Sequence, residues 1–156
     1  MASREELMRE ALRLARENVA AGGGPFAALV VRDGVVLAAG ANRVVLDGDP
    51  TAHAEVVAIR EACRRLAALR LDGCEIYASC EPCPMCAGAI AWARPARVFY
   101  AGTREDAAAA GFDDARLWTE LSLPPARRSI PAERVLAEEG RGPFDAWAAK
   151  PDRTPY

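Results

Sequence analysis

The chain holds a single histidine, His53, and it lies two residues before a glutamate in the segment H-A-E. Thirty residues downstream, Cys83 and Cys86 are separated by two residues in the segment P-C-P-M-C. Imidazole nitrogen and thiolate sulfur are preferred zinc ligands, and three of them leave a fourth position for water, as in catalytic zinc sites. The residue types and their spacing therefore predict a metal centre that activates water, with Glu55 beside it to transfer protons.

Two expected helices must position these residues. We predict one over about 53–69 and another over 82–93, with Pro84 in the first turn. Cysteines at i and i+3 of a first turn point the same way, and the positive end of the helix dipole favours the thiolates that zinc needs. His53 and Glu55 would face opposite sides in mid-helix, but both can reach past a helix N-terminus. The metal should therefore lie where two helix N-termini converge.

Cys80 allows a different interpretation of the same region. It lies three residues before Cys83, so His53, Cys80, Cys83 and Cys86 could form a closed Cys₃His site. The chain would then be a zinc-stabilised interaction module, in which Glu55 has no role. Because Cys80 precedes the turn that aims the other two cysteines, we interpret it as a supporting or packing residue.

The rest of the chain alternates helices and short strands. Ser3 and Glu6 form a capping box before a helix that ends at the glycines 22–24. Strands are expected over 26–31 and 35–39, joined by a D-G turn, and again over 74–79 and 98–101. Helical segments are expected over 105–122 and 142–150. Strands that alternate with helices favour parallel pairing, which predicts an α/β fold, a three-layer α/β/α sandwich.

Length and composition limit the possible classes of protein. The 156 residues predict one domain, 1–156, and 51% hydrophobic with 27% charged residues is typical of a globular protein. A net charge of -2 argues against a partner that presents a phosphate backbone. The first twenty residues are too charged for a signal peptide, and no apolar run approaches the roughly 20 residues of a membrane span. We therefore expect a cytoplasmic protein without a membrane partner.

The two metal-binding segments match the pattern H-x-E…P-C-x-x-C of zinc-dependent deaminases. The chain resembles the cytidine-deaminase-like superfamily and, more closely, the bacterial guanine deaminases of that fold. The resemblance extends over essentially the whole chain and is carried by these segments: G-P-F at 24–26, Asn42, 49–55, 79–86, A-R-P at 93–95, G-F-D-D at 111–114, P-F at 143–144, Trp147 and Tyr156. Bacterial tRNA adenosine deaminases share the metal-binding segments, so 111–114 and the aromatic C-terminus favour guanine deaminase.

This resemblance implies a mixed five-stranded sheet flanked by helices, and Zn²⁺ held by His53, Cys83 and Cys86. It implies that Glu55 is the proton shuttle and that Asp114 is a second carboxylate for substrate binding or proton transfer. The residues that it implies for binding the base are Phe26, Asn42, Ala54, Asp114 and Tyr156. Each also has a plainer interpretation, such as a turn residue for Asn42 and core packing for Phe26.

The implied activity is hydrolysis of guanine to xanthine and ammonia in purine salvage or catabolism, by a hydrolase that acts on an amidine C–N bond. Guanine presents two donors, N1–H and the 2-amino group, so its pocket needs an acceptor such as Asp114 or Asp113. A tRNA-specific adenosine deaminase is an alternative, but it requires a flipped base and a basic surface. A deaminase of cytosine or of another small aminated heterocycle is a further alternative.

The resemblance also implies a homodimer. In it the C-terminal segment, about 142–156, is exchanged so that Tyr156 of one subunit closes the pocket of the other. The plainer expectation for a short, proline-marked terminus is a frayed tail. A small flat base nevertheless needs a site closed to water during reaction, and no other late segment resembles a lid.

Overall fold

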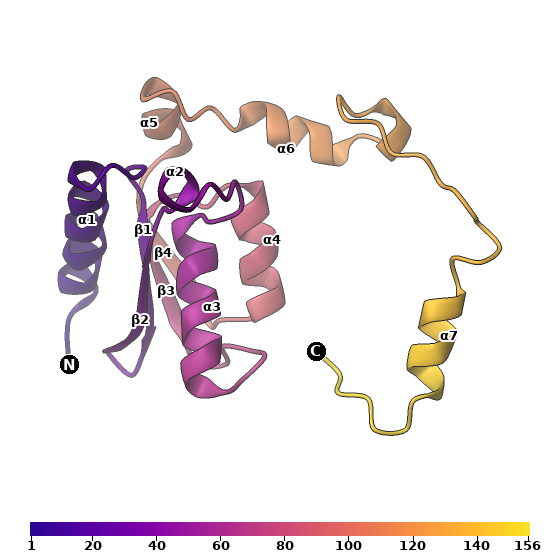
Figure 1. Cartoon of the computed structure of the whole chain (residues 1–156). Helices are drawn as coiled ribbons and strands as arrows, with labels where there is room; N and C mark the ends of the chain where they lie inside the picture. The colour runs from indigo at the N-terminus through magenta and orange to yellow at the C-terminus, as the bar shows by residue number, and fades with distance from the viewer. The chain divides into compact units, whose positions relative to one another are not determined.

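The computed structural model describes residues 1–156, which form two compact units, 1–114 and 115–156. The first unit holds the sheet and the helices that cover it (Figure 1). Its elements in chain order are α1 (Arg4–Ala20), β1 (Ala27–Arg32), β2 (Val35–Ala41), α2 (Val44–Asp47), α3 (Ala54–Leu66), β3 (Glu75–Cys80), α4 (Pro84–Ala93), β4 (Arg97–Gly102) and α5 (Arg104–Ala109). The second unit holds α6 (Ala115–Ser122), a 3₁₀ turn at Pro125–Arg127 and α7 (Gly142–Ala149).

The sheet has four strands in the order β2-β1-β3-β4. Strand β1 is antiparallel to β2 and β3, and β3 is parallel to β4, with Tyr77 opposite Phe99. A mixed sheet with parallel pairing in its second half was expected, but the prediction of five strands is wrong. Thr103 caps α5 directly after β4, and the later chain contains six prolines, which cannot donate to a strand ladder.

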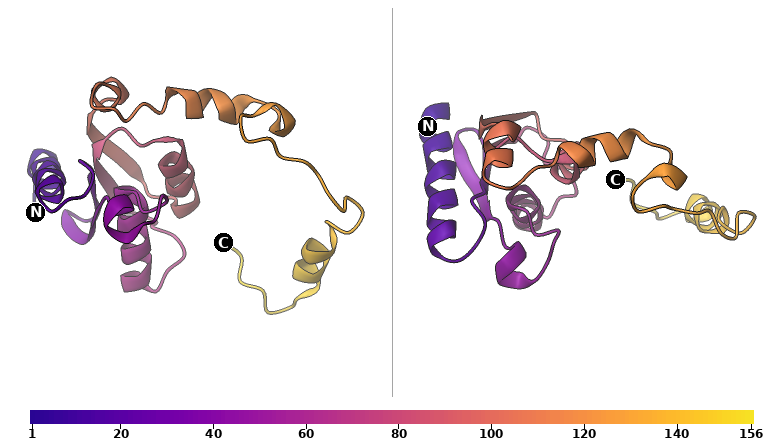
Figure 2. Two further views of the ribbon diagram at one scale, coloured as in Figure 1. Left: turned by 45° about the horizontal axis from the view of Figure 1, so that its top comes forward. Right: turned by 90° about the horizontal axis from the view of Figure 1, so that it is seen from above.

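Helices cover both faces of the sheet, so the prediction of a three-layer sandwich is confirmed (Figure 2). Side chains alternate along β1, as the pleat requires: Leu29 and Val31 face α1, whereas Ala28 and Val30 face α3. Both inner faces are buried, and the two apolar clusters fix the helices at a set distance from the strands. No helix of the chain is both long and apolar enough to cross a membrane.

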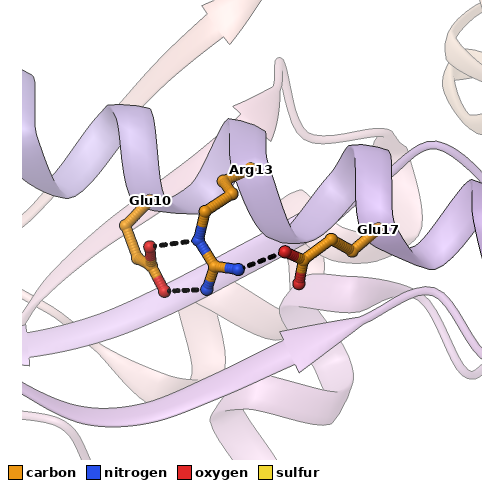
Figure 3. A network of polar contacts seen from close by, with 3 residues as sticks. All are labelled: Glu10, Arg13 and Glu17. Atoms are coloured by element: carbon orange, nitrogen blue, oxygen red, sulfur yellow. Dashed lines mark hydrogen bonds and ion pairs between the residues drawn. The ribbon is translucent and has the colours of Figure 1, made fainter.

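Helix α1 begins with the predicted capping box. Ser3 N–H donates to Glu6 Oε2 at 2.7 Å, and Glu6 N–H donates to Ser3 Oγ at 3.2 Å. On the exposed face, Arg13 donates to Glu10 at 2.7 and 2.6 Å and also to Glu17 (Figure 3). Ion pairs at this spacing stabilise a helix modestly. The opposite face of α1 packs on the sheet.

Helix α3 approaches the backbone of strand β2 closely at Gly40. A Cβ at Gly40 would lie 2.4 Å from Ala54 O and 2.6 Å from Ala58 N, both backbone atoms. Ala54, Ala58 and Ala62 face the sheet and are fully buried. This close approach requires glycine at position 40 and fixes the N-terminus of α3.

The structure differs from the expected elements in two places. Residues 42–51 contain the short helix α2, because Asn42 Oδ1 accepts a hydrogen bond from Val44 N–H and Arg43 pairs with Asp47. The helix expected over 105–122 is divided into α5 and α6, since Gly111 adopts a φ of +94° between them. The first helix, the hairpin and α7 lie where they were predicted.

Candidate metal centre and active site

Two helix N-termini meet at the predicted metal ligands. His53 is the N-cap residue of α3, and Cys83 is the N-cap residue of α4, with Pro84 at the first helical position. Neither side chain caps its own helix. Cys86 follows in the first turn of α4 and is buried. The N-cap positions thus leave the imidazole and the thiol to interact with each other.

The donor atoms of these three residues lie within 4.8 Å of one another. His53 Nδ1 lies 3.4 Å from Cys83 Sγ and 3.5 Å from Cys86 Sγ. Tetrahedral zinc with its usual bond lengths needs nitrogen–sulfur separations of about 3.5 Å. Donor types and spacing therefore fit Zn²⁺. Cys80 lies outside this group, and its Sγ contacts Thr103 O at 3.5 Å.

The pKa values of the two thiols are shifted in opposite directions. The pKa of Cys83 is lowered, because Cys86 donates a hydrogen bond to it and His53 lies beside it. The pKa of Cys86 is raised, because it donates to Cys83 and is buried. The hydrogen bond with Cys83 raises the pKa of His53. The cluster thus favours a thiolate at Cys83, which is the form that binds zinc.

Glu55 lies in the first turn of α3, next to the thiols, with only 8% of its surface exposed. Cys86 Sγ lies 3.4 Å from Glu55 Oε2. Burial raises the pKa of this carboxyl. A carboxyl whose pKa is raised by burial holds a proton more readily, which helps it to act as a general acid as well as a general base.

Two of the expected base-binding residues are joined through their backbones. Asn42 N–H donates to Phe26 O at 3.0 Å, and Asn42 is buried. Its Oδ1 accepts from Val44 N–H, so its amide nitrogen is the group left for another partner. The ring of Phe26 meets the edge of Phe112, with centroids 5.0 Å apart at 87°. Phe112 was not predicted as a site residue; its only signal was its place in the G-F-D-D segment.

The remaining residues expected to bind the base do not belong to the group of metal donors. Ala54 is the first residue of α3, so its backbone N–H has no partner within the helix, and its side chain is fully buried. Asp114 is partly buried at the end of the first unit. Tyr156 belongs to the second unit, where its ring lies edge-on to Trp147 with centroids 6.3 Å apart.

Imidazole and thiol donors at two converging helix N-termini, with a buried carboxyl beside them, define a zinc-binding enzyme site on an α/β sandwich. The chain belongs to the cytidine and deoxycytidylate deaminase family, because the model of that family's zinc-binding region matches residues 1–102. Family membership and the donor set agree on zinc.

Among individual relatives, the guanine deaminase of Bacillus subtilis is 54% identical over 92% of this chain and 92% of that protein. An X-ray structure of guanine deaminase from Bacillus subtilis superimposes with a TM-score of 0.97 at 50% identity and covers 99% of both chains. A tRNA-specific adenosine deaminase of Aquifex aeolicus is 41% identical over 62% of this chain and 64% of that protein. The likeness to this tRNA enzyme thus covers 62% of the chain, whereas the likeness to the guanine deaminase covers 92% of it.

Proposed function

We propose that this chain is a cytoplasmic zinc-dependent guanine deaminase, which hydrolyses guanine to xanthine and ammonia in purine salvage or catabolism. The observation that carries the proposal is the 54% identity to a guanine deaminase over 92% of both chains. The buried glutamate beside the zinc donors is consistent with hydrolysis. The net charge of -2 does not favour a large RNA substrate.

In this proposal His53, Cys83 and Cys86 hold the zinc. Bound zinc supplies a Lewis acid that lowers the pKa of water towards about 7. Glu55 accepts a proton from the attacking water and passes it to a ring nitrogen next to C2 of guanine. The water oxygen forms a bond to C2, and Glu55 then takes the proton of the new C2 hydroxyl and delivers it to the amine. The C2–N bond breaks to release ammonia, and the C2–O group becomes the carbonyl of xanthine. Burial raises the pKa of Glu55, which helps the carboxyl to hold the proton between the two transfers.

The chain's other residues would hold the base. The amide nitrogen of Asn42 can donate to an acceptor on the purine, and the ring of Phe26 can pack on its face. Guanine also presents N1–H and the 2-amino group as donors, and Asp114 is the carboxylate proposed to accept from them. A base without these donors would lack the hydrogen bonds to the carboxylate, which would favour guanine over other bases.

Ammonia release from a panel of guanine, adenine, cytosine, cytidine and tRNA tests this substrate assignment. We expect guanine to give the highest kcat/KM. Asp114→Ala should lower kcat/KM for guanine by roughly 10- to 100-fold, the size expected for lost hydrogen bonds to a charged group. Asp113→Ala, at the adjacent exposed position, is the matched control and should have a smaller effect.

The panel also separates the alternatives. Faster release from tRNA would identify an adenosine-editing enzyme, and faster release from cytosine would identify a pyrimidine deaminase. A rate on guanine that is unchanged in Asp114→Ala would remove Asp114 from the site. Release from no member of the panel by zinc-loaded protein would support the interaction module instead.

We further propose that the active form is a homodimer with exchanged C-terminal segments. None of the residues 115–156 is buried, although this unit carries many large apolar side chains. These exposed side chains include Leu117, Trp118, Leu121, Phe144 and Trp147. A segment of this composition needs an apolar partner surface, and the second subunit would provide it while Tyr156 closes the neighbouring pocket.

Deletion of residues 152–156 should reduce activity on guanine by well over tenfold and leave the zinc content unchanged, because the tail excludes water and binds no metal. A complementation experiment, in which two inactive variants are mixed, tests the exchange of tails directly. A tail-deleted chain and a Glu55→Gln chain, each nearly inactive alone, should regain activity together if tails are exchanged, because the intact tail would close the intact site. A monomer with full activity after deletion would reject the proposal.

A further inference from the structure

Four polar or charged residues are buried in this chain, and two of them, Asn18 and Ser79, take no part in the site described above. Asn18 lies near the C-terminal end of α1, on the helix that covers the other face of the sheet from α3. Its Nδ2 donates two hydrogen bonds, to Gly24 O at 2.7 Å and to Asn42 O at 2.8 Å. Because an amide nitrogen carries two hydrogens, both are used.

These two carbonyls belong to the segments that carry the proposed base-binding side chains. Gly24 O also accepts from Phe26 N–H at 2.9 Å, and Asn42 N–H donates to Phe26 O at 3.0 Å. The backbones of Gly24, Phe26 and Asn42 thus form one connected set of hydrogen bonds, in which the Asn18 amide joins the two ends. The amide thus supports the spacing between Phe26 and Asn42 from one side, in addition to the direct backbone hydrogen bond between them.

The glycine loop before Phe26 fits closely around Asn18. A Cβ at Gly23 would lie 2.4 Å from Asn18 Nδ2 and 2.8 Å from its Oδ1. Any side chain at position 23 would therefore displace the amide from its two carbonyls. The loop and the amide are matched in shape as well as in hydrogen bonding.

We infer that Asn18 is a positioning residue for base binding: it sets the distance between Phe26 and Asn42 without touching the base. This inference rests on the proposed function, in which those two side chains bind guanine. The requirement is chemical, because two carbonyl acceptors need two N–H donors from one short side chain. Aspartate has the same shape but offers only acceptors when ionised, and leucine offers neither.

The test compares Asn18→Asp and Asn18→Leu with the wild type, using guanine kinetics at a temperature well below unfolding. We expect KM for guanine to rise by about tenfold or more, as for a binding geometry that loses one or two hydrogen bonds. The kcat and the zinc content should stay within about twofold. Leu7→Ala is the matched control, because Leu7 is buried on the same helix and belongs to the apolar cluster on that face. It should lower the thermal midpoint and leave KM unchanged.

Gly23→Ala gives a second test from the loop side, and it decides the matter if the Asn18 variants do not fold. It leaves Asn18 in place but crowds its amide, so the same rise in KM is expected. Wild-type KM in the Asn18 and Gly23 variants, or an equal rise in Leu7→Ala, would overturn the inference. If the wild type does not act on guanine, the proposed function fails instead, and the comparison is made with the panel base that it does deaminate.

Discussion

Glu55→Gln should lower turnover of guanine by roughly 10²–10⁴-fold, the range by which general acid–base groups accelerate reactions. The effect should lie near the upper end, because one carboxyl performs several proton transfers in the proposed reaction. Glutamine keeps the shape of the side chain, and position 55 is not one of the proposed zinc ligands, so fold and zinc content should be unchanged. Steady-state ammonia release and elemental analysis on the same preparation measure both quantities.

Glu61→Gln is the matched control for this variant. Glu61 lies on the same helix, but it pairs with Arg64 and Arg65 on the exposed side, away from the donor group. The control should retain activity within about twofold of the wild type. A Glu55→Gln enzyme with more than about a tenth of the wild-type rate would remove Glu55 from the mechanism.

Removal of zinc should abolish activity and also destabilise the protein. We expect one zinc per chain, and dialysis against a chelator should leave less than about 1% of the rate, with recovery on adding Zn²⁺ back. A ligand that binds only the folded state stabilises it by about 2.7 kcal/mol at a hundredfold excess over its Kd. The thermal midpoint should therefore fall on chelation and rise again on reloading.

Cys83→Ala and Cys80→Ala distinguish the open site from the closed one. Cys83 Sγ lies 3.4 Å from His53 Nδ1, whereas Cys80 lies outside the donor group and contacts Thr103 O. The open site predicts that Cys83→Ala loses zinc and Cys80→Ala keeps it. Equal loss of zinc from both variants would instead identify a Cys₃His centre without a position for water.

The sequence predicts the layers of the fold better than the number of strands in its sheet. The capping box of α1 and the D-G hairpin are local signals, because the residues that make each contact are adjacent in the chain. The number of strands is not local. Whether a segment after β4 joins the sheet depends on long-range pairing, and the resemblance to a five-stranded family gave the wrong number for this chain.

At the site, the candidate metal donors could be predicted because each lies in a short segment whose residue types are specific to zinc binding. His53, Cys83 and Cys86 come together as the spacing indicated. The residues that hold the base-binding segments in place could not be predicted in the same way. Asparagine at position 18 fits the end of any helix, and only the tertiary structure brings its amide to Gly24 and Asn42, the latter 24 residues away. The contact of Phe112 with Phe26 likewise joins distant segments.

The contact of α3 with β2 determines where this sequence can tolerate change. Gly40, Ala54, Ala58 and Ala62 are already small, so substitution at these positions is almost always an enlargement that the close-packed layer must resist. The α1 side of the sheet is built from larger residues, which can be exchanged for others of similar volume. In a mutant library selected for activity, variation should therefore accumulate beneath α1 and be rare beneath α3. Efforts to stabilise the protein should begin on the α1 side, where repacking leaves the helix that carries Glu55 undisturbed.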